Sequence, residues 1–164
     1  MKRIWAGVVA GVLAGGLVGC SVHPGVAAIV GDRTITQEHL EDAAADLGYS
    51  PTDTLFLLIA APYVIDAATD NGVGVSVADA RSGLEARATQ AGTQARAGAG
   101  AIEVWRFALA VDNLQGLPDG GAILADVESE VFGLELVINP RYGELDRTTG
   151  EISAAPLPWI VTGE

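Results

Sequence analysis

The side chains best suited to catalysis or metal binding are scarce in this sequence. Its 164 residues include one cysteine, Cys20, and two histidines, His23 and His39. A structural zinc site needs about four ligands. A serine hydrolase needs an activated nucleophile, and no Gly-x-Ser-x-Gly motif is present. The sequence therefore predicts no catalytic residue, no metal site and no cofactor.

The acidic residues of one expected helix are the other group that could bind a metal ion. One face of this helix carries Glu38, Glu41, Asp42 and Asp46. A dedicated calcium loop spaces its oxygen ligands around a glycine, and that pattern is missing. We interpret the four carboxylates as a solvated acidic face. His39, in the first turn of the same helix, is expected to face solvent.

The first twenty residues have the features of an export signal. Lys2 and Arg3 precede the uncharged apolar residues 4–18, a stretch shorter than the about 20 residues of a membrane span. It ends in Leu17-Val18-Gly19-Cys20, which resembles the lipobox of bacterial lipoproteins, where the cysteine receives a diacylglyceryl group. We expect cleavage before Cys20, lipidation of Cys20, and attachment to the extracytoplasmic face of the cell membrane.

The charge balance excludes one class of partner. The chain has a formal net charge of -12, and removal of residues 1–19 takes away two positive charges and no negative ones, which leaves -14. Such a body repels phosphate backbones and anionic lipid headgroups. Nucleic-acid binding is therefore excluded, and membrane attachment must come from the lipid.

The rest of the sequence predicts a mainly α-helical domain, closed by a short two-stranded pairing of its N- and C-terminal strands. The segments Val26–Val30 and 134–138 have strand character, and Gly31-Asp32 forms a turn after the first. An unpaired apolar strand leaves backbone groups without partners, so we expect the two strands to pair. Ile29 and Val137 are expected on these paired strands as buried aliphatic residues.

Three hydroxyl side chains mark the starts of helices. Thr36, Ser50 and Ser76 each precede a segment with helical spacing of apolar residues, and each can accept a hydrogen bond from the first turn. The first helix is expected over residues 37–47, and Pro51 is suited to the first position of the second.

The second helix is expected to be the most apolar part of the domain. Residues 55–68 carry one charge, Asp66, and include Pro62, which should kink or divide the helix. A helix that is apolar on nearly all sides must be covered by other helices or leave a surface for a partner. We interpret it as a buried or groove-lining helix and not as a membrane span.

Two further helices follow the third. One is expected from residue 102 to 117, and another over residues 120–132. Residues 86–100 are rich in alanine and interrupted by glycine, which indicates a fraying helix end and a connecting loop. The glycines of residues 97–100 and 116–121 do not follow a strand, so they are expected in loops and not in a phosphate-binding turn.

Three segments together carry a family resemblance: residues 28–36, residues 73–79, and the closing Val-Ile-Asn-Pro-Arg-Tyr-Gly of residues 137–143. Over residues 27–146 the chain resembles the SurA N-terminal-like domain of SurA- and PrsA-type foldases. The resemblance implies a helical domain that embraces unfolded exported chains. The parvulin-type isomerase domain often found in that family occupies about 90 residues and uses paired buried histidines, and neither is expected here.

These observations lead to one expected function and one alternative. We expect a lipid-anchored, chaperone-like protein that binds unfolded or newly exported polypeptides without isomerase activity. The alternative is a structural or adaptor lipoprotein that binds one specific partner of the cell envelope. The expected peptide-binding residues are apolar positions of the second and fourth helices, namely Leu55, Phe56, Ile59, Tyr63, Trp105 and Leu109.

The expected organisation has four parts. Residues 1–19 are the lipoprotein signal peptide, residues 20–26 the lipidated tether, residues 27–146 the helical domain, and residues 147–164 an extension that either lies on the domain or extends away from it. Arg141 and Tyr142, which follow the closing strand, are expected to fix the closure of the domain.

Overall fold

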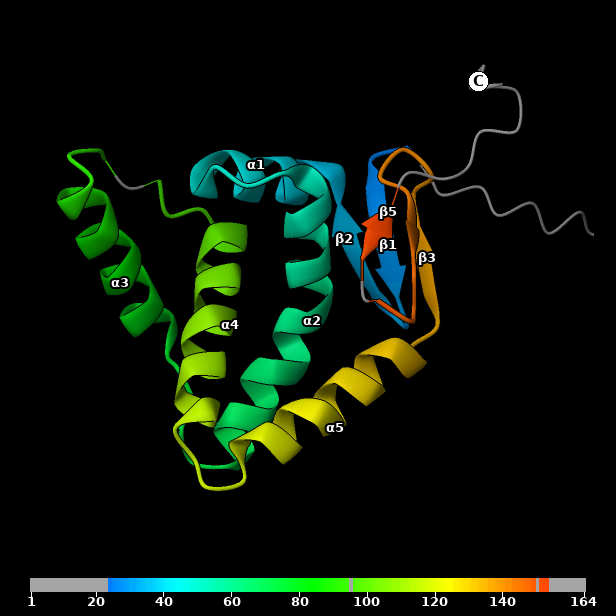
Figure 1. Cartoon of the computed structure of the whole chain (residues 1–164). Helices are drawn as coiled ribbons and strands as arrows, with labels where there is room; N and C mark the ends of the chain where they lie inside the picture. Colours follow the sequence, from blue (N-terminus) through cyan, green and yellow to red (C-terminus); the bar gives the residue numbers. More distant parts are fainter. Residues whose placement is uncertain (1–23, 95, 150, 154–164) are drawn as a thin grey trace, which may run out of the picture.

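The computed structural model describes residues 24–94, 96–149 and 151–153. Within them, helices form most of the fold, and the strands lie together at one side (Figure 1). The expected mainly helical class is confirmed. The helices are α1 (Gln37–Leu47), α2 (Pro51–Asp70), α3 (Val77–Gln90), α4 (Ala99–Gln115) and α5 (Gly120–Gly133). The strands are β1 (Val26–Val30), β2 (Arg33–Thr36), β3 (Leu136–Ile138), β4 (Glu144–Leu145) and β5 (Ile152–Ser153).

A three-stranded antiparallel sheet joins the beginning and the end of the helical series. Its strand order is β2-β1-β3, and Ile29 on β1 lies opposite Val137 on β3, which confirms the expected pairing. The turn after β1 also brings β2 into the sheet as a hairpin. Beyond β3, the backbone N–H and the side-chain amide of Asn139 donate to the carbonyls of Ala27 and Val26, at 2.8 and 2.9 Å. The closure is thus held by backbone and side chain together.

The two faces of β1 have different surroundings. Ala28 and Val30 are buried, whereas Ile29 and its partner Val137 are half-buried. The expectation that Ile29 and Val137 are buried aliphatic residues is therefore wrong. Successive side chains of a strand point to opposite faces, so the core-facing residue is the neighbour, Val30.

The three predicted helix starts are confirmed. Thr36, Ser50 and Ser76 each accept a hydrogen bond from the backbone N–H three residues later. Helix α1 spans the predicted residues and ends at Gly48, whose φ of 71° is in the left-handed region that glycine adopts without strain.

Helix α2 lies at the centre of the core and continues through Pro62, so the proline does not divide it. In the described part of the chain it is also the one helix long and apolar enough to cross a membrane, although half of its most apolar window is buried by the fold. Core helices commonly share this composition. Its buried residues are Thr54, Leu55, Leu58, Ile59, Ala60, Ala61, Val64, Ile65 and Ala68.

The start of α4 packs tightly against α1. Gly100 is a buried residue of α4, not a loop residue as expected, and a Cβ at this position would lie 2.7 Å from the Cβ of Ala43. Glycine therefore allows the two helices to approach. Asp46 accepts a hydrogen bond from the backbone N–H of Gly98, at 3.1 Å, beside the positive end of the α4 dipole. Asp46 therefore connects α1 to the start of α4 and is not only part of a solvated face.

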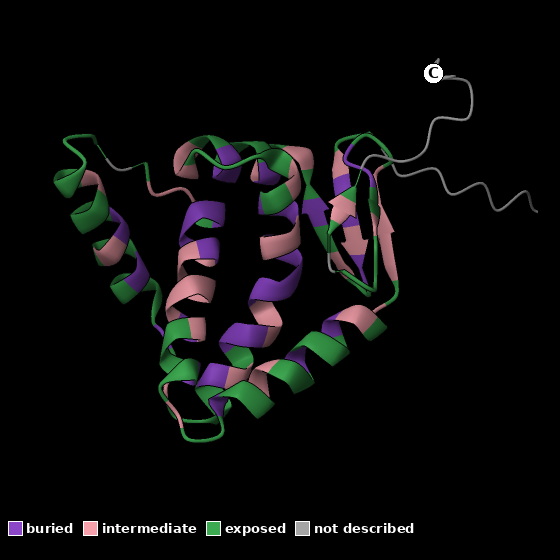
Figure 2. Ribbon diagram, in the orientation of Figure 1, coloured by how far each residue is buried: buried purple, intermediate pink, exposed green. Residues whose placement is uncertain are grey.

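The helices differ in how much of their surface is buried (Figure 2). Helices α2 and α4 carry many buried residues, whereas α3 buries only Ala80 and Leu84. In Figure 1, α3 stands beside α4 on the side away from α2, and α5 crosses towards the sheet. Helix α3 therefore depends mainly on its contact with α4.

The last described residues lie on the domain. Strands β4 and β5 form a small antiparallel hairpin, and Ile152 packs against the core beside α2. The described residues of the extension expected from residue 147, which are 147–149 and 151–153, therefore lie on the domain. The expected signal peptide, the lipidation at Cys20, His23, and residues 154–164 lie outside the described residues.

Tyr142 closes the domain as expected. Its ring is buried, and its hydroxyl donates to a carboxylate oxygen of Glu41 on α1, at 3.4 Å. A guanidinium nitrogen of Arg141 lies 3.6 Å from the same oxygen. Burial, together with the negative charge of Glu41, raises the pKa of Tyr142 above its ordinary value of 10.0.

This raised pKa predicts a loss of stability in alkali. The folded state favours the neutral phenol, so the contribution of Tyr142 is complete below pH 10.0, the ordinary pKa, and is lost as the pH rises through the folded-state pKa. In urea unfolding at pH values from about 8 to 11, the free energy of unfolding of Tyr142→Phe should decrease less with rising pH than that of the wild type. Tyr49→Phe, at an exposed tyrosine, should keep the wild-type decrease. An equal decrease of the free energy of unfolding in all three proteins would show that Tyr142 is not the group whose ionisation destabilises the fold.

Candidate functional site

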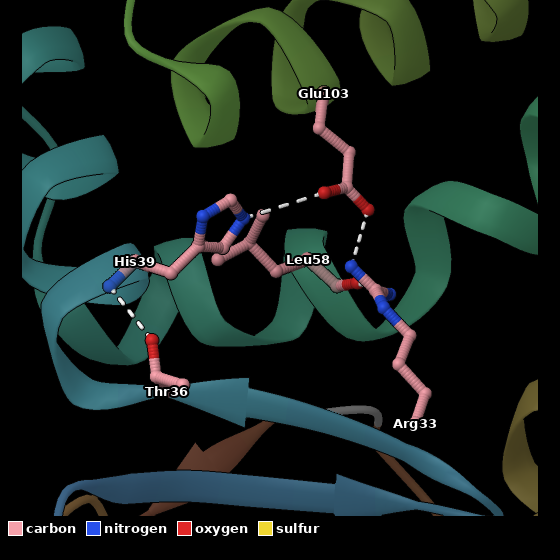
Figure 3. A network of polar contacts seen from close by, with 5 residues as sticks. All are labelled: Arg33, Thr36, His39, Leu58 and Glu103. Carbon is pink, nitrogen blue, oxygen red and sulfur yellow. Dashed lines mark hydrogen bonds and ion pairs between the residues drawn. The ribbon is translucent and has the colours of Figure 1, made fainter.

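Four elements of the fold meet at one cluster of polar groups (Figure 3). Arg33 on β2 donates one hydrogen bond to the backbone carbonyl of Leu58 on α2, at 2.7 Å, and another to Glu103 on α4, at 2.5 Å. The other carboxylate oxygen of Glu103 lies 3.4 Å from Nε2 of His39 on α1. All three charged or titratable side chains are partly exposed. The cluster connects the sheet to three helices.

The position of Arg33 follows from the proline in α2. In a helix, the carbonyl of Leu58 would accept a hydrogen bond from the N–H four residues later, but that residue is Pro62, which has no N–H. The guanidinium of Arg33 supplies the missing donor. This replacement gives a physical reason why α2 passes through Pro62 unbroken.

The polar cluster was not predicted from the sequence, and one expectation about it is wrong. His39 is half-buried beside Glu103, not turned freely to solvent. Arg33 and Glu103 are separated by 70 positions, and no periodic pattern links them. Pro62 was a local signal for the free carbonyl, because a proline inside a helix leaves the carbonyl four residues earlier without its N–H donor. Within the described residues, no group of three or more His, Cys, Asp or Glu side chains is placed to hold a metal ion.

An apolar hollow opens where α5 crosses α2 and α4. Its volume is about 120 Å³. Aromatic rings reach it from all three helices: Phe56 from α2, Phe107 from α4 and Phe132 from α5. Each of these rings is half-buried. The hollow therefore offers apolar surface to solvent without being an enclosed cavity.

The structure does not bring the six expected peptide-binding residues together. Leu55 and Ile59 are 0 % exposed and belong to the core, so in this structure they offer no surface to a peptide. Phe56 lines the apolar hollow. Tyr63 and Leu109 are half-buried and pack against the core.

Trp105 lies on a different side of α4. Its ring is packed against α3, where the guanidinium of Arg87 lies 5.3 Å from the ring centroid. A Cβ at position 83 would lie 2.5 Å from the indole Nε1, so Gly83 is what allows this contact. Phe107 is two residues later, which is a rotation of about 200° around the helix. A single groove containing both Phe56 and Trp105 is therefore excluded.

The comparisons leave the family unassigned. No protein-family model, no curated protein and no solved structure matches this chain. The resemblance to the SurA N-terminal-like domain stays a prediction.

The link between Pro62 and Arg33 can be tested by a double-mutant cycle. Arg33→Gln should destabilise the protein by about 1–3 kcal/mol, because the Leu58 carbonyl and Glu103 both lose a charged donor. In a Pro62→Ala background the Leu58 carbonyl regains a helical N–H, so the same substitution should cost about 1 kcal/mol less.

The matched control is Arg141→Gln, which removes an arginine beside Glu41, outside the network of Pro62, Leu58 and Arg33, so its cost should be the same with proline or alanine at position 62. The free energy of unfolding in urea measures each corner of the cycle. If the cost of Arg33→Gln is identical in both backgrounds, Arg33 does not replace the missing donor.

Proposed function

We propose that this protein is a lipid-anchored, extracytoplasmic, chaperone-like protein that binds unfolded or newly exported polypeptides and has no isomerase activity. The observation that carries the proposal is the apolar hollow, where Phe56, Phe107 and Phe132 converge from three helices. Unfolded chains expose the apolar side chains that folded proteins bury. Aromatic rings bind such side chains with large contact area and little loss of conformational freedom.

The size of the hollow favours weak and unselective binding. A volume of about 120 Å³ suits a single side chain of a client. Burial of one aliphatic or aromatic side chain contributes about 1.5–3 kcal/mol, which is far from the affinity of a specific complex. A holding chaperone requires this behaviour, because it has to release its clients.

The N-terminal sequence supports the proposed location. The basic Lys2 and Arg3, the apolar residues 4–18 and the Leu-Val-Gly-Cys ending at Cys20 together fit an exported lipoprotein. A lipid anchor would hold the helical domain close to the site where exported chains emerge. The formal charge of -14 after cleavage would attract basic clients, and added salt would weaken this attraction.

Client binding should depend on Phe56 and not on Trp105. Phe56→Ala removes a ring from the apolar hollow, so it should reduce the suppression of aggregation of an unfolded basic protein. Trp105→Ala removes a larger ring on the α3 side of α4 and should leave the suppression intact. Light scattering measures suppression, and circular dichroism confirms that both variants are folded.

Equal suppression by the Phe56 variant and the wild type would remove the apolar hollow from the proposal. Absence of suppression by the wild type in all conditions, together with capture of one folded envelope protein, would favour the adaptor alternative. A measurable acceleration of prolyl isomerisation would refute the non-enzymatic assignment.

Lipidation should depend on Cys20. In cells given a labelled fatty acid, the wild type should incorporate the label and sediment with the membranes. Cys20→Ala should incorporate none, because no other cysteine is present in the chain. Ser21→Ala, at the next position, is the matched control and should behave as the wild type. A Cys20→Ala protein that is processed and membrane-bound as before would exclude the lipoprotein assignment.

A further inference from the structure

A second hollow lies between α2 and α3, with the first half of α4 as its floor. Its volume is about 520 Å³, within the range of about 300–1,000 Å³ that is typical of ligand sites. We name it the cationic groove. Its apolar wall is formed by Pro62, Ile65, Val77 and Ile102, and its basic residues are Arg81 and Arg106.

The apolar wall of the cationic groove is left partly uncovered. Val77 is 50 % exposed, and in the described part of the chain only Tyr49 is a comparable exposed large hydrophobic residue. Ile65 and Ile102 are buried residues that also line the groove. An apolar side chain seated in the groove would therefore remove Val77 from water, which is favourable.

The groove also carries unneutralised positive charge. Among the described residues, neither Arg81 nor Arg106 takes part in an ion pair. The Nε of Arg106 donates to the backbone carbonyl of Val75, at 3.0 Å, which ties the guanidinium to the segment just before α3. This bond leaves the two terminal nitrogens of Arg106 as donors for a ligand.

The acidic residues of the groove do not cancel this charge. Glu103 lines the groove, but its carboxylate is engaged by Arg33 and lies beside His39. Asp66 is then the single other carboxylate that lines the groove, and within the described residues it has no ion-pair partner. Two guanidinium groups against one such carboxylate give the groove a local positive charge in a chain whose formal net charge is -12.

We propose that the cationic groove binds an extended polypeptide segment in which a carboxylate adjoins an apolar side chain. The guanidinium groups would bind the carboxylate through charge-assisted hydrogen bonds, for which arginine is better suited than lysine. Val77 and its apolar neighbours would receive the side chain. The groove is open to solvent, which suits a segment of a longer chain better than an enclosed small molecule.

This inference rests on the proposed function only in taking a polypeptide as the ligand. Arg81 and Arg106 belong to α3 and α4, whereas α5 forms one wall of the apolar hollow, and the two sites share no lining residue. Their charge preferences are also opposite, since the acidic body attracts basic clients and the groove attracts an acidic segment. Loss of one site should therefore leave the other intact.

The test uses the full protein, purified from its expressing cells and reconstituted in phosphatidylcholine vesicles. The probes are fluorescein-labelled, end-capped peptides that differ only in a central Ile-Asp or Ile-Asn pair, plus a peptide that ends in isoleucine with a free carboxylate. Fluorescence anisotropy gives the affinities. The Ile-Asp peptide should bind about tenfold more tightly than the Ile-Asn peptide. Binding of the third peptide would show that a terminal carboxylate is accepted as well.

Variants identify the site. Arg81→Gln, at an exposed side chain, should remove most of the preference for the Ile-Asp peptide. Val77→Ser should lower the affinity for both peptides. Arg141→Gln, an arginine beside Glu41 outside the groove, should change neither affinity, and Phe56→Ala, in the apolar hollow, should leave the preference for Ile-Asp over Ile-Asn unchanged. These controls separate failure of the groove from failure of the proposed function.

Three results would overturn the inference. One is equal affinity for the Ile-Asp and Ile-Asn peptides, and another is an unchanged preference in a folded Arg81→Gln protein. The third is displacement of the peptide by decanoate, with a higher affinity for decanoate than for any of the peptides. That result would mean that the groove binds an amphiphile with a carboxylate head and not a polypeptide.

Discussion

One backbone carbonyl at the centre of the fold determines how several elements meet. Pro62 leaves the carbonyl of Leu58 without a helical donor, and the guanidinium of Arg33 takes the place of the missing N–H. A partly buried guanidinium needs a counter-charge, and Glu103 on α4 provides it. The sheet, through β2, is thereby fixed against α2 and α4 at once. Strand β1 pairs with β2 on one side and with β3 on the other, so the closure of the domain is connected to Arg33 through the sheet.

The core around α2 is made largely of small side chains. Ala43, Ala60, Ala61 and Ala101 are buried, and Gly100 allows α1 and α4 to approach. Because small residues leave little space between the helices, the rings of Phe56, Phe107, Phe132 and Trp105 lie at the edges of the core, half-buried. The two hollows are lined by different residues of α2 and α4. The same helices therefore supply both the core and the candidate binding surfaces.

Local signals in the sequence were sufficient to place most elements, and they failed where distant residues meet. A hydroxyl at Ser50 or Ser76 reports on its own helix start, so those boundaries could be predicted. The surroundings of Phe56 and Trp105 could not be predicted, because which side of α2 meets α5, and which side of α4 meets α3, depends on packing across the whole domain. The sequence around Gly100 favours a loop, since the close approach of Gly100 to Ala43 depends on how α1 and α4 pack in three dimensions.

The limited anchoring of α3 has a consequence for the kinetics of the domain. This helix buries only Ala80 and Leu84, and it rests on α4 through the contact between Gly83 and Trp105. An element with so little buried apolar surface opens at a lower free-energy cost than the domain as a whole, as a separate subglobal unit. Its amide protons should therefore exchange with solvent before those of α2 and α4. Since α3 also forms one wall of the cationic groove, the width of the groove can adjust to its ligand without unfolding of the core.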